Sequence, residues 1–223
     1  MNITHKHPEY RERWKHLTAG RYNGAFYYSQ LIVEKIMPRV KTDRPWVTVN
    51  IGRAEDSAIV FIHNNKNPER YEFLKQYKNL ILVCSTEETQ KKVAHLGAAV
   101  YLPLSVDIKE IEKYKTTKTK NACYYGRRKK INYPGCILPA NIDIISGLPR
   151  EQALKQVAKY HRCAAVGLAA IEAKILGCEI IPYDPRYPDP EIWKILDVQD
   201  AAEILQTEIE LVDERNDHHE ENY

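Results

Sequence analysis

Cysteine is scarce in this chain of 223 residues: there are five, and no pair has the C-x-x-C spacing of zinc or redox sites. An odd number also argues against a complete disulfide framework. We therefore expect the cysteines to be reduced and buried. Long apolar runs are missing too, because no stretch reaches the ~18 residues that a membrane-spanning helix needs. We therefore expect neither a disulfide-stapled domain nor a membrane-spanning helix.

Apolar residues are few at the start of the sequence, where Met1 to Lys15 are mostly polar and charged. We expect no signal peptide and a cytoplasmic location. Hydrophobic residues make up 43% of the chain and charged residues 28%, close to an ordinary globular protein. This balance excludes a collagen-like repeat, a coiled coil and a disordered chain, and the length predicts one or two domains.

Charge is nearly balanced, with a net charge of +3, but it is unevenly distributed. Lys113 to Lys130 contains eight basic residues and no acidic one. Such a run could meet a polyanion. The last residues, Asp213 to Tyr223, contain five acids and one arginine, which predicts a solvated, mobile tail.

Strand and helix patterns alternate along the chain, in two sets that are separated near Asp107. The expected strands are 46–51, 58–62, 80–84, 99–102, 122–125, 142–145, 162–166 and 178–183. The expected helices are 22–40, 67–77, 86–96, 149–160, 168–176 and 189–206. Ser85 is expected to cap the helix at 86–96, with Glu88 completing a capping box.

Alternation of this kind predicts parallel sheets covered by helices on both faces. The expected fold is α/β, with two small Rossmann-like domains facing each other across a cleft. We expect an N-terminal domain at 1–105, a C-terminal domain at 106–205 and the acidic tail at 206–223. Ligands in such folds bind beyond the carboxyl ends of the strands, so chemistry is sought there.

A glycine followed by four cations stands at the end of one expected strand: Gly126, Arg127, Arg128, Lys129 and Lys130. Glycine lets the backbone approach a ligand closely, and guanidinium groups grip phosphate oxygens with two hydrogen bonds. The segment predicts a diphosphate site. The alternative is a solvated basic loop.

Glu172 lies in the second turn of an expected helix that is otherwise almost wholly apolar. A carboxylate there costs free energy unless it is paired. It could accept hydrogen bonds from the sugar hydroxyls of a nucleotide. The alternative is a partly exposed glutamate near Lys174 or Arg162.

The segment from Gly167 to Asp184 resembles the donor-nucleotide segment of GT-B-fold glycosyltransferases, especially the retaining group that uses nucleotide-diphospho-sugars. The similarity comprises Gly167-Leu168, Ile171-Glu172-Ala173, Leu176-Gly177-Cys178 and the strand that follows. The Gly126-Arg127 segment is similar to the same family's strand-Gly-Arg loop. Leu102 to Asp107 looks like the crossover between its two domains.

The resemblance implies a role for each matching residue in binding the donor. Glu172 would bind the ribose hydroxyls, and Gly167 and Leu168 would line the donor pocket. Arg127, with one of Arg128, Lys129 or Lys130, would hold the diphosphate and neutralise the charge that develops on it. The family uses protein cations for this, so no metal and no cofactor are implied, and the chain has no Asp-x-Asp triplet.

Candidates on the acceptor side come from the first half of the chain. His63 follows a buried strand, where it could orient a substrate or act as a base, or merely cap the next element. The turn formed by Gly20, Arg21, Asn23 and Gly24 precedes a long helix and could approach an anion.

These observations predict a compact glycosyltransferase that transfers a sugar from a UDP- or GDP-linked donor to an acceptor held by residues 1–105. One alternative is a nucleotide-binding protein without transferase activity, because Ala164 replaces a glutamate that the family has eight residues before Glu172. A second alternative is a DNA-binding or DNA-modifying protein, because of the basic run. The acceptor and the oligomeric state stay open.

Overall fold

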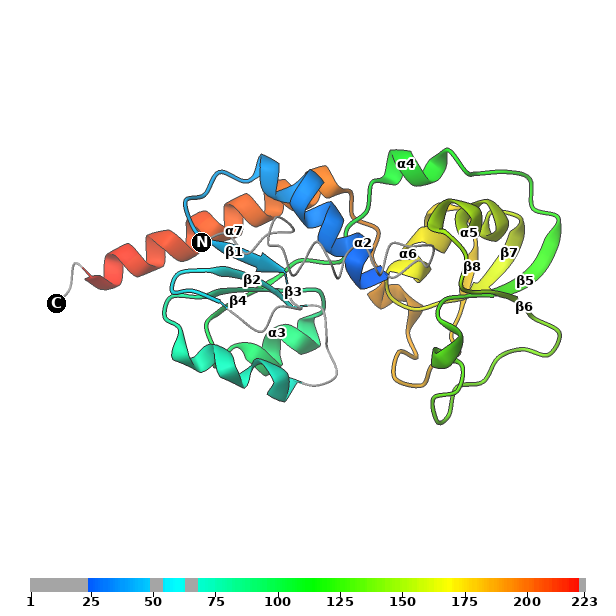
Figure 1. The fold of residues 1–223 in the computed structure, drawn as a ribbon, viewed down its shortest axis with the longest axis horizontal. Helices are drawn as coiled ribbons and strands as arrows, with labels where there is room; N and C mark the ends of the chain where they lie inside the picture. The colour runs from blue at the N-terminus through cyan, green and yellow to red at the C-terminus, as the bar shows by residue number, and fades with distance from the viewer. Residues whose placement is uncertain (1–23, 49–53, 63–67, 221–223) are drawn as a thin grey trace. The chain divides into compact units, whose positions relative to one another are not determined.

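The computed structural model describes residues 24–48, 54–62 and 68–220 (Figure 1). These residues form two compact units, which are described separately. Unit 1 contains residues 29–103 and 198–220 of the described part, and unit 2 contains 24–28 and 104–197. Each unit has one four-stranded parallel sheet, so the expected α/β class with parallel sheets is confirmed.

The sheet of unit 1 has the order β1-β2-β3-β4, the same as the order along the chain. Its strands are β1 (Trp46–Thr48), β2 (Ile59–Ile62), β3 (Ile81–Cys84) and β4 (Ala98–Tyr101). Every residue of β2 and β3 is buried, as expected for strands covered on both faces. Because the order never reverses, the described strands of this sheet form no topological switch point where a ligand crevice would open.

Helical segments cover both faces of this sheet. The segments η3 (Pro68–Gln76) and α3 (Glu87–Val93) pack against one face, where Leu74, Leu82 and Val93 are buried in one core cluster. On the opposite face lies α7 (Val198–Glu220), which packs against η1 (Ile32–Ile36) and η2 (Met37–Arg39) (Figure 1).

Two helix predictions in the first half of the chain were wrong in detail. The first long helix divides into α2 (Gly24–Leu31), the π-helical η1 and the 3-10 helix η2, which contains Pro38. The cap of α3 is Thr86 rather than Ser85, because the Thr86 side chain accepts a hydrogen bond from the Thr89 amide at 3.2 Å.

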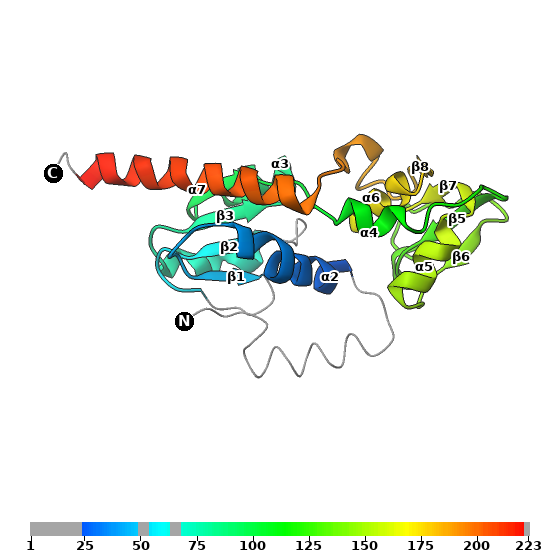
Figure 2. The same cartoon turned by 90° about the horizontal axis from the view of Figure 1, so that it is seen from above.

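Helix α7 corrects the prediction of a separate acidic tail. It continues unbroken to Glu220 (Figure 2). Leu205, Ile209 and Val212 on this helix are buried. Their spacing forms an apolar stripe along one side of α7. Burial of this stripe stabilises the helix, which includes the acidic residues after Val212. The expected helix at 189–206 is interrupted, because only η5 (Pro190–Ile192) and the start of α7 are helical.

Arg44 ties α7 to the loops that precede β2 and β3. Its Nε donates to Asp213 Oδ1 at 3.0 Å, and its Nη1 donates to the carbonyls of Ser57 and Asn79, both at 2.9 Å. Ser57 and Asn79 have left-handed backbone conformations, with φ of 61° and 54°. One guanidinium group therefore satisfies two carbonyls in tight turns and one carboxylate on the helix.

We expect Arg44→Ala to lower the free energy of unfolding by about 2–3 kcal/mol, because hydrogen bonds of charged groups contribute about 1.5–3 kcal/mol each and partly overlap here. Urea unfolding followed by circular dichroism measures the change. Arg215→Ala is the control, since Arg215 is exposed and its Nε donates only within α7, to the Leu211 carbonyl. Equal and small losses in both variants would contradict this role of Arg44.

The sheet of unit 2 has the order β6-β5-β7-β8. Its strands are β5 (Lys120–Tyr125), β6 (Asp143–Ile145), β7 (Tyr160–Ala164) and β8 (Glu179–Ile181). The chain passes from β5 to β6 on one side of it, and then crosses to β7 on the other side of β5. A topological switch point therefore lies between β5 and β7.

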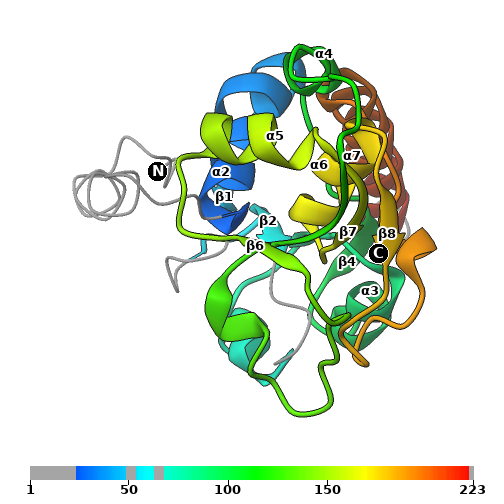
Figure 3. The same ribbon diagram turned by 90° about the vertical axis from the view of Figure 1, so that its right-hand side faces the viewer.

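Helices α5 (Arg150–Val157) and α6 (Leu168–Ile175) contact each other and both pack on β7, so they share one face of this sheet (Figure 3). A short helix, α4 (Ile108–Glu112), packs on α6 and was not anticipated. Asp107 caps α4 by accepting a hydrogen bond from the Glu110 amide at 2.9 Å. The packing of these three helices brings the side chains of Glu110, Arg150 and Glu172 close together.

All five cysteines lie in the described part of the chain and are free thiols. Four are buried, and Cys136 is half-buried. Burial raises the pKa of the Cys84 thiol to about 12. Among the described residues, no helix combines the length and the apolar character needed to cross a membrane.

Candidate functional site

The switch point of the unit 2 sheet brings two glycines to neighbouring strand ends. Gly126 directly follows β5, and Gly167 stands at the N-terminus of α6, three residues after β7. β5 and β7 are hydrogen-bonded neighbours, with Tyr124 opposite Ala164. The two segments singled out from the sequence are therefore neighbours at one edge of one sheet.

Glycine is required at position 126 by a close contact. A Cβ atom there would lie 2.8 Å from the Tyr124 hydroxyl oxygen. That hydroxyl group is fixed, because it donates to the Arg127 carbonyl at 2.8 Å and Tyr124 is fully buried. Burial also raises the pKa of Tyr124 to about 12. The tyrosine thereby holds the backbone at the start of the basic loop.

The four cations after Gly126 form a short turn at this edge. Arg127, Arg128 and Lys129 are exposed, and Lys130 is half-buried. The last three form the 3-10 helix η4 (Arg128–Lys130), and the Arg128 amide donates to Ser146 Oγ at 3.0 Å. The turn presents several positive charges next to the switch point.

The structure divides the long basic run into two parts. Lys118 precedes β5 and donates to the Leu176 carbonyl at 2.6 Å, and Lys120 at the start of β5 pairs with Asp143 at 3.2 Å. Residues 127–130 follow the carboxyl end of the same strand. The run is therefore not one continuous basic surface.

Gly167 has φ of 66° and ψ of −140°, a conformation that side chains with a Cβ rarely adopt. A Cβ atom at this position would meet nothing within 4 Å. The glycine is needed for its backbone conformation, and there is open space beside it. Leu168, the first residue of α6, is buried.

Glu172 is fully buried, so the alternative of a partly exposed glutamate near Lys174 or Arg162 is wrong. Its two oxygens accept hydrogen bonds from protein donors: Oε2 from the Tyr125 hydroxyl and Oε1 from Arg150 Nε, both at 2.7 Å. The partners come from the end of β5 and the start of α5.

Arg150 joins Glu172 to a second carboxylate. Its Nη1 donates to Glu110 Oε1 at 2.6 Å, and its guanidinium carbon lies 3.8 Å from the centre of the Tyr27 ring. The Tyr27 hydroxyl donates to Glu110 Oε2 at 3.3 Å. Burial raises the pKa of this tyrosine, since its charged form would lose hydration beside two carboxylates.

Sequence reasoning missed Arg150, Glu110 and Tyr27. The carboxylate in an apolar helix signalled that Glu172 needed a partner, but no spacing rule connects it with residues 22, 62 or 145 positions away. The packing of α4 and α5 against α6 brings Glu110 and Arg150 to Glu172, and Tyr27 on α2 completes the group.

Several predicted site residues lie outside the described part of the chain. These are His63, Gly20, Arg21 and Asn23. Gly24 is the first residue of α2. Ala164, at the end of β7, is fully buried. Within the described ranges, no three His, Cys, Asp or Glu side chains are grouped closely enough to hold a metal ion.

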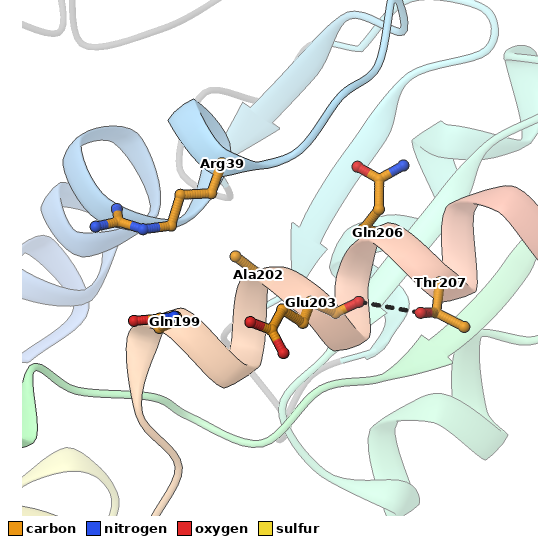
Figure 4. A pocket seen from close by; sticks show the side chains of 6 residues that line it. All are labelled: Arg39, Gln199, Ala202, Glu203, Gln206 and Thr207. Atoms are coloured by element: carbon orange, nitrogen blue, oxygen red, sulfur yellow. Dashed lines mark hydrogen bonds between the residues drawn. The ribbon is translucent and has the colours of Figure 1, made fainter.

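A shallow pocket of about 400 Å³ lies elsewhere, in unit 1, between η2 and α7. It is lined by Arg39, Gln199, Ala202, Glu203, Gln206 and Thr207 (Figure 4). The Thr207 hydroxyl donates within the helix, to the Glu203 carbonyl at 3.2 Å. None of the residues predicted from the sequence lines this pocket.

Comparison of the chain with family models, with curated proteins and with solved structures found no match.

Proposed function

We propose that the protein is a glycosyltransferase that binds a nucleotide-diphospho-sugar at the carboxyl edge of the unit 2 sheet. The observation that carries the proposal is the switch point between β5 and β7. It places the Gly126 loop with its four cations beside the Gly167 turn at the N-terminus of α6. Parallel α/β sheets bind ligands at such points.

The chemistry of this edge suits a diphosphate. The exposed side chains of Arg127, Arg128 and Lys129 can hold phosphate oxygens and neutralise the leaving diphosphate as the bond to the sugar breaks, and the half-buried Lys130 adds to the positive charge. The amide groups at the start of α6 and the positive end of its dipole add to the attraction for an anion. Transfer by this route uses protein groups alone.

Glu172 keeps its proposed place as the ligand of the ribose hydroxyls, with one condition set by the structure. Both of its oxygens already accept hydrogen bonds, from Tyr125 and Arg150. Because Glu172 is also 0% exposed, a ribose hydroxyl can reach it only if a neighbouring group moves, and the neutral Tyr125 hydroxyl is easier to displace than the charged Arg150. Tyr125→Phe removes the competing hydroxyl group and separates these roles.

Thermal unfolding with a panel of UDP-, GDP-, ADP-, CMP- and dTDP-sugars tests the proposal. A ligand at 100 times its dissociation constant adds about 2.7 kcal/mol of stability. For a chain of this size, each kcal/mol of added stability raises the melting temperature by about 2–4 °C. We expect a selective shift with UDP- or GDP-sugars. The absence of a shift with every compound would overturn the proposal.

A second candidate function is nucleotide-sugar binding without transfer. It is favoured by Ala164, because this fully buried alanine brings no carboxylate to the end of β7, where the family has a glutamate. Release of nucleoside diphosphate from a bound donor distinguishes the two candidates. Turnover supports the transferase, whereas saturable binding without release supports the binding protein.

A further inference from the structure

A cation and an aromatic ring are stacked where the loops after β5 and β8 meet. The Arg186 guanidinium carbon lies 3.9 Å from the centre of the Tyr133 ring. Tyr133 is in the loop that follows the basic turn, and Arg186 follows the carboxyl end of β8. Both side chains reach the surface, since Tyr133 is 44% exposed and the Arg186 side chain is 30% exposed.

Asp184 fixes the orientation of the guanidinium group. Arg186 Nε donates to Asp184 Oδ1 at 2.6 Å, and its Nη2 pairs with the other carboxylate oxygen. Asp184 is only 1% exposed, so the carboxylate itself is held in the protein. Because the fork of Arg186 is directed at Asp184 and one face of the guanidinium plane lies over Tyr133, a ligand would meet the pair on its outer face rather than at the edge of the guanidinium group.

The two loops are held together next to this pair. The Ile137 amide donates to the Tyr183 carbonyl at 3.0 Å. Gly135 has φ of 81°, and a Cβ atom there would lie 3.1 Å from Pro185 Cγ. The positive φ of Gly135 and its close contact with Pro185 both disfavour a larger residue there, so this glycine lets the loops that carry Tyr133 and Arg186 approach each other.

The same loop connects the stacked pair to the proposed diphosphate site. The Tyr133 amide donates to the Lys130 carbonyl at 3.4 Å, so the ring directly follows the basic turn. Tyr124, whose hydroxyl group holds the Arg127 carbonyl, packs edge-on against Tyr183 at 5.4 Å between ring centres. The cations at 127–130 and the Tyr133–Arg186 pair therefore lie at the same end of the unit 2 strands, the carboxyl end.

We infer that Tyr133 and Arg186 form a stacking platform for the nucleobase of a nucleotide whose diphosphate binds residues 127–130. This inference rests on the proposed function and assigns a subsite within it. Planar π-systems stack on aromatic rings and on guanidinium planes, and such stacking tolerates different bases. An arginine already neutralised by Asp184 adds little to phosphate binding, which separates its role from that of the basic turn.

Calorimetric titration of UDP, GDP and inorganic pyrophosphate into the wild type and Tyr133→Ala tests the platform. We expect about a tenfold or larger loss of affinity for both nucleotides, in line with stacking measured by alanine substitution. Pyrophosphate affinity should not change. Tyr133→Phe should keep the nucleotide affinity, because the ring remains. Tyr187→Ala is the matched control, since Tyr187 packs on Trp193 at 5.1 Å instead.

The possible failures are distinguishable. If Tyr133→Ala weakens pyrophosphate and nucleotides equally, the ring only braces the basic turn and the platform is overturned. If it leaves UDP and GDP affinities unchanged, the platform is overturned while the proposed function stands. If the wild type binds none of the three compounds, the proposed function falls and the platform with it.

Discussion

Glu172→Ala is expected to lower the free energy of unfolding by about 3–5 kcal/mol, because it leaves the charge of Arg150 in a largely buried position without its fully buried partner. Arg150 has a side-chain exposure of 14%, and the Glu172 side chain is at 0%. The remaining partner, Glu110, is 37% exposed and compensates only in part. Urea unfolding followed by circular dichroism gives the free energy.

Glu151→Ala is the matched control, on the residue next to Arg150. Glu151 pairs with Lys155 at 2.6 Å, but the two side chains are 62% and 59% exposed. Exposed pairs contribute about 0–1 kcal/mol, so this variant should be almost as stable as the wild type. A loss below 1 kcal/mol for Glu172→Ala would contradict the buried network. A double-mutant cycle with Arg150→Ala then measures the coupling directly.

The second large effect concerns the basic turn. Arg127→Ala is expected to weaken UDP and GDP binding about tenfold or more, because one charge-assisted hydrogen bond contributes about 1.5–3 kcal/mol. Removing Arg128 and Lys129 as well should lower the affinity further and make it less dependent on salt. Calorimetric titration at low and moderate ionic strength measures both effects.

Lys115→Ala provides the control for this charge change. Lys115 belongs to the same basic run but precedes β5, and it pairs with Glu112 at 2.7 Å. We expect its loss to leave nucleotide affinity nearly unchanged. An equal weakening by Lys115→Ala and Arg127→Ala would indicate general attraction of anions rather than a site at the carboxyl edge.

The strands were the most predictable part of the fold. Continuous apolar runs such as 58–62 and 80–84 correspond to β2 and β3, because strands covered on both faces need apolar residues at every position. Their order in the sheets was not predictable, since β1–β4 follow the chain while β6 and β7 lie on opposite sides of β5. Alternation of strands and helices alone does not define which strands are neighbours.

Less of the site was predictable than of the fold. Gly126 and Gly167 were singled out because they stand at the end of an expected strand and at the start of an expected helix. The structure gives a physical reason for each: a Cβ atom at position 126 would clash with Tyr124, and position 167 has a positive φ. The pairing of Glu172 with Arg150 did not follow, because it depends on how α5 packs against α6. The stacking of Arg186 on Tyr133 likewise depends on two loops that are distant in sequence.

Hydrogen exchange measured by mass spectrometry, with and without saturating UDP or GDP, tests the central claim most directly. The account predicts slower exchange in 126–130 and at the start of α6, at 167–172. It predicts no change along the unit 1 pocket at 199–207. Protection confined to that pocket, or no protection anywhere, would contradict a nucleotide site at the carboxyl edge of the unit 2 sheet.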